Sequence, residues 1–328
     1  MAPPIKPTQE YIDLLNKAVA REIQVSAQYL LQHTKMEKLL RKVIRENYLL
    51  DTTTYEEFGK ILKELGIQEM KHLGNIMERI YILGGIATTK PDKIKIGGSI
   101  KEFAELGLKA EEEALELYRK IIQAAKEIGD RDTWSLFSKI YNDEEEHLLK
   151  FQDYIEIEDE PDLGETAESE WRSIFTKEYL SLLNKALASE ISAIVQYTNQ
   201  HEKADGLERM RKKKAPLEVA TGKNKASVVS GMLKEIFLQE MEHMEMIAER
   251  IYEIDREALA IVDPLPEIGD TVDDFIKLDR EAENYAIVLY RKIIDEATKL
   301  GDIKTKRMFE DIIQQEEEHY WKFDDYLP

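Results

Sequence analysis

Hydrophobic residues recur every three or four positions over long stretches of this chain, a spacing that places them on one face of an α-helix. Short segments rich in glycine, proline, aspartate and threonine separate these stretches. The pattern predicts an all-α protein of eight helices. The expected ranges are 8–31 with an extension to about 49, 55–83, 99–128, 131–157, 176–208, 227–256, 271–299 and 302–326.

The same pattern is written twice along the 328 residues. The segment LLNKAVAREIQVSAQY at 14–29 returns as LLNKALASEISAIVQY at 182–197. Further on, LYRKII occurs at 117 and 289, and EEEH occurs at 144 and 316. Similarity at matched spacing indicates a tandem duplication of one four-helix unit.

The connections between the helices suggest how the units are divided. The segment 86–98 has one proline and two glycines and is too long for a simple turn, so it suits a crossover between parallel helices. We expect a first domain at 1–157, an acidic linker at 158–172 and a second domain at 173–328. We also expect the basic run Arg211–Lys214 to lie in an exposed loop spanning 210–226.

Composition narrows the classes of function. With 46 basic and 66 acidic residues the net charge is -20, which disfavours binding to nucleic acid or to an anionic membrane. The absence of cysteine excludes disulfides, zinc–thiolate sites and iron–sulfur clusters. The sequence has no apolar run long enough to span a membrane and no hydrophobic leader, so we expect a cytoplasmic protein.

The informative residues are glutamates at positions that packing would give to leucine. Glu22, for example, lies on the hydrophobic stripe between Ala18 and Val25. Each of the eight helices carries one such glutamate, and four of them also carry a histidine three residues later. The set is Glu22, Glu69, His72, Glu111, Glu144 and His147 in the first unit, and Glu190, Glu240, His243, Glu283, Glu316 and His319 in the second.

Four carboxylates in one bundle core are costly unless they are protonated or bind cations. Two divalent ions would balance the charge of four glutamates, and oxygen ligands with two imidazoles favour iron or manganese. One Glu from each of two helices with Glu-x-x-His from the other two is the ligand pattern of di-iron and di-manganese bundles. A single Glu-x-x-His is common by chance, but four at matched core positions favour two di-metal centres.

These residues resemble the ferritin-like superfamily, and within it bacterioferritin. The shared features are the E-x-x-A/S-x-x-Q-Y pattern at 22–29, Glu-Met-Lys-His at 69–72, the glycine- and proline-containing crossover, and Asp-Glu-Glu-x-His at 143–147. The resemblance implies two ferritin-like bundles, each with a di-iron ferroxidase centre, Glu69 and Glu144 being bridging ligands and Glu22 and Glu111 terminal ones. It implies oxidation of Fe(II) by O2 or hydrogen peroxide, with mixed Mn/Fe centres as an alternative.

Further residues are singled out by the resemblance. Tyr29 and Tyr197 match a tyrosine beside the metals, either an electron donor or a core residue with a hydrogen-bonded hydroxyl. Met70 and Met241 match a haem-ligand position, although methionine there is more often a packing residue. His33 and His201 are repeat-matched, and we prefer a structural role for both.

Three alternatives to a ferroxidase stay open: an iron store or buffer, a di-metal oxidase acting on another substrate, and a structural bundle with degenerate sites. The fusion of two units could hinder assembly of a closed shell, although a homo-oligomer is compatible with the sequence. Asp143 is expected to accept a hydrogen bond from a ligand histidine. Its counterpart Gln315 is neutral, so we expect the two centres to differ in metal affinity or rate.

Overall fold

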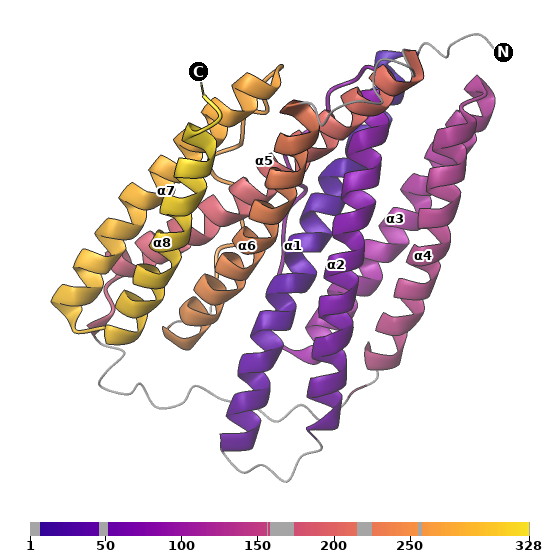
Figure 1. Ribbon diagram of the computed structural model, residues 1–328. Helices are drawn as coiled ribbons and strands as arrows, with labels where there is room; N and C mark the ends of the chain where they lie inside the picture. The colour runs from indigo at the N-terminus through magenta and orange to yellow at the C-terminus, as the bar shows by residue number, and fades with distance from the viewer. Residues whose placement is uncertain are drawn as a thin grey trace. The chain divides into compact units, whose positions relative to one another are not determined.

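The computed structural model describes residues 7–45, 52–155, 157, 174–214, 225–254 and 258–327. These residues contain eight α-helices and no strand (Figure 1), which confirms the all-α prediction. The helices are α1 (Gln9–Arg45), α2 (Thr53–Ile82), α3 (Ile100–Ile128), α4 (Arg131–Ile155), α5 (Lys177–Lys214), α6 (Lys225–Ile254), α7 (Val272–Leu300) and α8 (Ile303–Asp324).

The helices form two compact units, one built on α1–α4 and the other on α6–α8 with the first part of α5. In the first, α1 packs along α2 and α3 along α4, and the pairs meet through α1 with α3 and α2 with α4 (Figure 1). In the second, α7 packs along α8, and α6 contacts both. Two tandem four-helix bundles are thereby confirmed. The exact domain boundaries stay a prediction, and the expected linker 158–172 lies outside the described residues.

A long crossover joins the second and third helix of each bundle and is held against the first helix. The amide of Gln32 donates to Ile96 O at 2.8 Å, and Gln200 donates to Ile268 O at 3.4 Å. Gly97, with φ 80°, then turns the chain into α3 through a backbone conformation that side chains other than glycine rarely adopt. The crossover thus runs beside the helix that carries the first ligand.

A buried ion pair fixes one end of each bundle. Arg79 on α2 donates from Nη2 to Asp130 Oδ1 at 2.6 Å, and the Thr133 hydroxyl donates to Asp130 Oδ2 at 2.6 Å. Arg250 and Asp302 form the matching pair at 2.8 Å. Asp130 is fully buried, so its negative charge has to be stabilised by these partners. The pair ties the second helix of the bundle to the start of the fourth.

The structure corrects one expectation. Helix α5 continues to Lys214, so the basic run Arg211–Lys214, expected in a loop, is helical. The remainder of that loop, 215–224, lies outside the described residues. An unbroken run of residues that favour helix explains the extension, because the first glycine or proline after Gly206 is Pro216.

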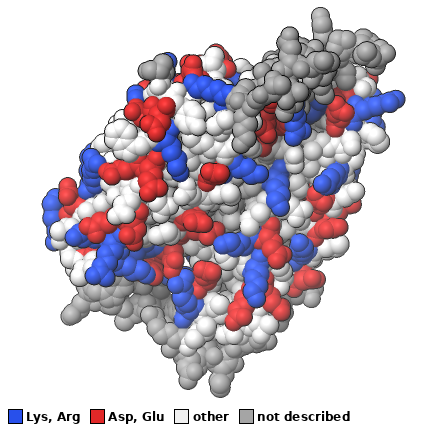
Figure 2. Space-filling view, in the orientation of Figure 1, with Lys and Arg blue, Asp and Glu red and all other residues white. Residues whose placement is uncertain are grey.

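Charged side chains cover the surface with both signs interspersed, as the face in Figure 2 shows. Among the described residues, no helix combines the length and hydrophobicity needed to span a membrane. The hydrophobic residues instead form the interiors of the bundles, where Tyr29, Phe58, Phe103 and Phe137 are fully buried. The same interiors contain the predicted glutamates.

Candidate metal centres

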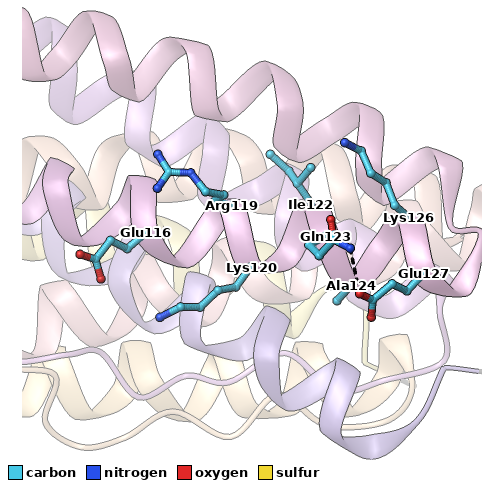
Figure 3. A pocket seen from close by; sticks show the side chains of 8 residues that line it. All are labelled: Glu116, Arg119, Lys120, Ile122, Gln123, Ala124, Lys126 and Glu127. Atoms are coloured by element: carbon cyan, nitrogen blue, oxygen red, sulfur yellow. Dashed lines mark hydrogen bonds between the residues drawn. The ribbon is translucent and has the colours of Figure 1, made fainter.

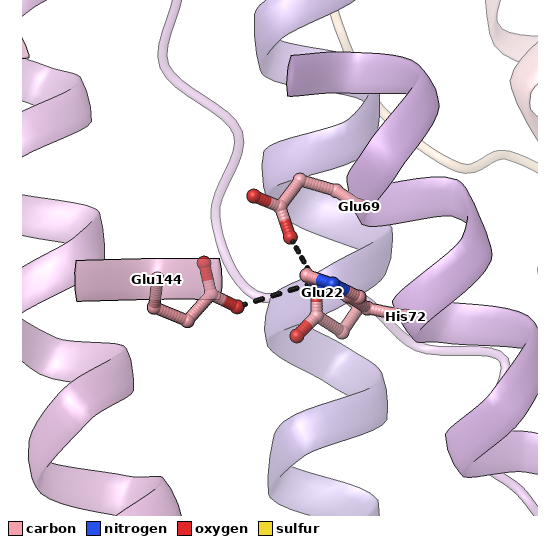
Figure 4. Close-up of side chains that lie close together, drawn as sticks. All are labelled: Glu22, Glu69, His72 and Glu144. Carbon is pink, nitrogen blue, oxygen red and sulfur yellow. Dashed lines mark hydrogen bonds and ion pairs between the residues drawn. The ribbon is translucent and has the colours of Figure 1, made fainter. Parts of the chain in front are cut away.

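The six predicted residues of the first bundle meet in its core. Each of them is at most 4% exposed. Their ligand atoms form two overlapping groups, within each of which the atoms lie within 4.8 Å of one another. The groups are Glu22, Glu69, His72 and Glu144, drawn in Figure 4, and Glu69, Glu111, Glu144 and His147. Because Glu69 and Glu144 belong to both groups, they are placed to bridge two metal ions.

Both histidines turn Nδ1 toward the shared glutamates. His72 Nδ1 lies 2.9 Å from Glu69 Oε2 and 3.4 Å from Glu144 Oε1. His147 Nδ1 lies 2.7 Å from Glu69 Oε1 and 3.0 Å from Glu144 Oε2. One imidazole therefore belongs to each ligand group, which fits a pair of ions with one histidine for each ion.

The second bundle repeats this arrangement. Its two groups are Glu190, Glu240, His243 and Glu316, and Glu240, Glu283, Glu316 and His319. His243 Nδ1 lies 3.0 Å from Glu240 Oε2 and 2.9 Å from Glu316 Oε1. His319 Nδ1 lies 3.1 Å from Glu240 Oε1. All twelve predicted ligands are thus placed as two sets of six.

The donor sets fit a pair of divalent ions. Each is four carboxylates and two imidazoles without sulfur, which suits iron or manganese. Glu22 Oε2 is buried and has no hydrogen-bond partner among the described residues, and an unsatisfied buried carboxylate oxygen is costly. A metal ion would satisfy it.

Protons balance part of the buried charge when metal is absent. Burial opposes charge on His72, but hydrogen bonds to Glu144 and Glu69 raise its pKa to about 12. Burial also lowers the pKa of His147, but hydrogen bonds to the same two glutamates raise it to about 10. Burial raises the pKa of Glu111 to about 8 and that of Glu22 well above its usual range. Metal binding must therefore displace protons.

The outer nitrogens of the histidines have different partners in the two bundles. His72 Nε2 lies 3.2 Å from Asp143 Oδ2, the contact expected from the sequence. In the second bundle Gln315 instead accepts a hydrogen bond from Gln239 at 3.4 Å, and Gln239 Oε1 lies 3.0 Å from His319 Nε2. A carboxylate thus supports one histidine in the first centre, and an amide supports the other histidine in the second.

Tyrosine hydroxyls hold the outer glutamates of each centre. Tyr29 donates to Glu111 Oε1, and its counterpart Tyr197 donates to Glu283 Oε1 at 2.5 Å. The sequence analysis did not assign a functional role to Tyr118, yet its hydroxyl donates to Glu22. Tyr290 does the same for Glu190 in the second bundle. Each terminal carboxylate therefore has an oriented partner.

Sequence reasoning missed a buried arginine beside the first centre. Arg21 is 5% exposed, and its Nη2 donates to Glu111 Oε2 at 2.6 Å and to Ala110 O at 2.8 Å. The matched position in the second bundle is Ser189, whose hydroxyl donates to Ala186 O on its own helix. The sequence did contain a signal for this difference, because the residue before the first ligand is arginine in the first repeat and serine in the second.

A second unpredicted difference lies one helical turn before the third-helix ligand. Asp279 in α7 is fully buried, accepts a hydrogen bond from Gln196 at 2.7 Å, and has a pKa that burial raises well above its usual range. The first bundle has Gly107 there, and a Cβ at this glycine would overlap the ring of Phe151. The second bundle has the matching ring, Phe323, fully buried in addition to the acid.

The remaining predicted residues lie outside the ligand groups. Met70 and Met241 are half-buried beside the second-helix glutamates, and haem binding there stays a prediction. His33 Nδ1 lies 2.8 Å from Gly59 O, and His201 Nδ1 lies 2.9 Å from Ser230 O, contacts that fit the structural role we preferred. A surface hollow on α3, drawn in Figure 3, is lined by Glu116 to Glu127 and contains none of the predicted ligands.

Comparison with known proteins shows the family of this chain. The sequence matches the ferritin family, described as a ferritin-like domain, at residues 12–159 and again at 224–328, which together are more than half of the chain. The chain belongs to the ferritin-like family. Among its relatives, the bacterioferritin of Desulfovibrio desulfuricans is 34% identical over 142 residues, covering 43% of this chain and 72% of that protein. The bacterioferritin of Rhodobacter capsulatus is 32% identical over 156 residues, covering 47% of this chain and 88% of that protein.

This ferritin-like chain is also similar to solved structures of bacterioferritins. A Rhodobacter capsulatus bacterioferritin with a metal-free dinuclear site and a haem iron is 29% identical, with a TM-score of 0.39, and covers 46% of this chain and 86% of that one. A Desulfovibrio desulfuricans bacterioferritin, whose diiron site was seen in different catalytic states, is 28% identical, with a TM-score of 0.39, and covers 48% and 81%. Each relative spans about one of the two units.

Proposed function

We propose that this chain is a ferroxidase-like di-iron protein with two centres. Each bundle takes up two Fe(II) ions as substrate, and O2 or hydrogen peroxide oxidises them to Fe(III). One observation supports this most strongly: in each bundle two ligand groups share a pair of glutamates, Glu69 with Glu144 and Glu240 with Glu316. Shared carboxylates keep two ions close enough to act on one oxidant.

The residues of the chain would perform three tasks in this reaction. The shared glutamates hold two ions at one spacing, and the tyrosine hydroxyls orient the terminal carboxylates. The surrounding core excludes water, since all six ligands of the first centre are nearly fully buried. Iron supplies the redox chemistry, and the protein supplies geometry and charge. Whether Tyr29 and Tyr197 also donate electrons stays a prediction.

The test is Fe(II) oxidation by variants that lack one or both centres. Glu69→Ala with His72→Ala should abolish oxidation in the first bundle only, and Glu240→Ala with His243→Ala in the second only. The combined variant should oxidise Fe(II) no faster than buffer, measured by Fe(III) absorbance after anaerobic loading. Glu145→Ala with Glu318→Ala, at exposed positions near the ligands, is the matched control. Oxidation at the normal rate by the combined variant would refute the proposal.

Iron storage is the alternative that the relatives' name, bacterioferritin, favours. A store requires a hollow assembly, and it would retain far more than the four irons per chain that two di-metal centres hold. Solution mass together with iron content after aerobic loading separates the two functions. The same metal analysis decides between iron, manganese and a mixed pair.

A further inference from the structure

A cavity of about 310 Å³ leads into the second centre from the surface of its own bundle. Its inner wall includes the ligand carboxylates of Glu190 and Glu283. Its outer residues include Glu267 and Glu281, which are both exposed. Ser189 also lines the cavity, and its side chain is small. The cavity therefore connects residues at the surface of the bundle with ligands of the second set.

The first bundle has an arginine where the second has this serine. The Arg21 side chain is 5% exposed and donates from Nε and Nη2 to Ala110 O at 3.2 and 2.8 Å. Its Nη1 lies 3.2 Å from the Tyr118 hydroxyl. Ala110 corresponds to Ala282, which lines the cavity of the second bundle. The guanidinium thus occupies the side of the first centre that corresponds to this cavity.

The exposed charges around this side are also reversed. Counting along the repeats, Glu267 corresponds to Lys95 and Glu281 corresponds to Lys109. Lys95 and Lys109 are exposed, and Lys109 lies 3.8 Å from Glu113, which reduces its effect. The counterpart of Glu113 is the neutral Tyr285. An acidic rim concentrates divalent cations, whereas a basic rim repels them.

Arg21 also changes the ligand set itself. Both oxygens of Glu111 are engaged in the first centre, Oε2 by Arg21 and Oε1 by Tyr29. Arg21 Nη1 lies 3.5 Å from Glu22 Oε1 as well. A fixed buried cation beside the carboxylates repels a metal ion and competes for the oxygen that would bind it. The group that contains Glu111 and His147 is the more affected.

We propose that the second centre is the accessible, tightly binding one, which divalent cations reach through the Ser189 cavity, and that Arg21 closes this side of the first centre and weakens its Glu111–His147 metal position. The inference rests on the proposed function, because it requires that both centres bind metal. Arg21 acts here by position and charge and is not a catalytic residue.

Cobalt(II) binding tests the inference without relying on oxidation. The full chain is prepared in two forms, one with the first centre removed by Glu69→Ala and His72→Ala, and one with the second removed by Glu240→Ala and His243→Ala. Calorimetry and visible absorption then count the Co(II) ions in the remaining centre. The second centre should take two ions, and the first should take its second ion about 100-fold more weakly. Stopped-flow loading should be slower for the first centre.

Reciprocal substitutions locate the cause. Arg21→Ser, made where only the first centre remains, should tighten its second Co(II) site by about 100-fold, and Arg21→Lys, which keeps the charge, should tighten it much less. Ser189→Arg, made where only the second centre remains, should weaken binding and slow loading. The second bundle offers the new arginine the same acceptors, since Ala282, Glu283 and Tyr290 match Ala110, Glu111 and Tyr118. Glu267→Lys with Glu281→Lys should slow loading and leave the stoichiometry at two.

Equal affinities and loading rates for the two centres would overturn the inference and leave the proposed function intact. Reciprocal substitutions without effect on Co(II) binding would also overturn it. Failure of the unmutated chain to bind Co(II) at either centre would instead overturn the proposed function, and the inference with it. If circular dichroism shows that Arg21→Ser does not fold, Ser189→Arg decides the outcome, because its cavity already has room for the side chain.

Discussion

The first and second bundles contain the same six ligands but surround them differently. Each shares a pair of glutamates between two groups, and each turns histidine Nδ1 atoms toward that pair. Around these ligands, the first bundle has Arg21 where the second has Ser189. It has Asp143 where the second has Gln315. The ligands alone therefore do not determine how a centre binds metal. Neighbouring charges, partners and access set how the same six groups behave.

The largest expected effect is one of pH, and it should be nearly the same in both bundles. The pKa of His72 and that of His243 are each raised to about 12, so both histidines carry a proton at neutral pH without metal. The pKa values of His147 and His319 are about 10 and 9. Metal displaces these protons, so affinity rises with pH. Each proton that metal displaces makes the product of the two binding constants rise about tenfold per pH unit, so release from the two histidines alone gives about 100-fold.

Above pH 8 the two centres should differ in the number of protons that metal binding releases. Burial raises the pKa of Glu111 to about 8, with Arg21 opposing the rise, whereas the pKa of Glu283 is raised well above its usual range. Glu111 is therefore ionised at pH 9, and we predict that its counterpart Glu283 releases its proton at higher pH than Glu111 does. Calorimetry in buffers of different ionisation enthalpy should find about one proton fewer released by the first centre. Equal proton release at pH 9 would contradict this assignment of charge.

The next largest effect concerns the buried ion pairs at the bundle ends. Asp130→Ala leaves the Arg79 guanidinium buried without its carboxylate and should destabilise the first bundle by about 3–5 kcal/mol. Asp302→Ala should do the same to the second bundle through Arg250. Denaturant unfolding with the metal-binding signal of each bundle as a separate probe measures both. A loss of similar size in both bundles would show that their scaffolds, unlike their centres, are equivalent.

A smaller effect is expected from the residues that support the histidines. Asp143→Gln removes the carboxylate beside His72 Nε2 and should weaken metal binding in the first centre by about tenfold. Gln315→Asp should strengthen binding in the second centre, where His243 Nε2 has no hydrogen-bond partner among the described residues. Competition with a coloured chelator measures both changes. Glu146→Gln, at an exposed position, should leave affinity unchanged.

The smallest effect is expected from an exposed ion pair. Lys109 and Glu113 are each 68% exposed and 3.8 Å apart, so Lys109→Ala should leave the unfolding midpoint unchanged. It should nevertheless speed metal loading of the first centre slightly, because it removes a positive charge from the rim. Unchanged loading would show that the charge of Lys109 has no influence on access, and slower loading would contradict the expected direction.

Periodicity in the sequence predicted the helices and all twelve ligands, because a glutamate on a hydrophobic stripe has to point into the core. It could not predict Arg21, which directly precedes Glu22 and lies about 100° away from it around the helix. The burial of Arg21 depends on acceptors that α3 supplies, Ala110 O and Glu111, and these are brought close only by the packing of two helices. The helical run after Met210 was missed because a basic segment was interpreted as a loop.

The contact between Gly107 and Phe151 also constrains how the two halves of the gene can evolve. Duplication gives each copy freedom to diverge while the other preserves the original chemistry. A new Cβ at position 107 would overlap the ring of Phe151, so an acid there requires the ring to move. The second copy has Asp279 together with the matching ring, Phe323, so its core accommodates both side chains. A substitution that one copy accepts is therefore unfavourable in the other until the packing around it has changed.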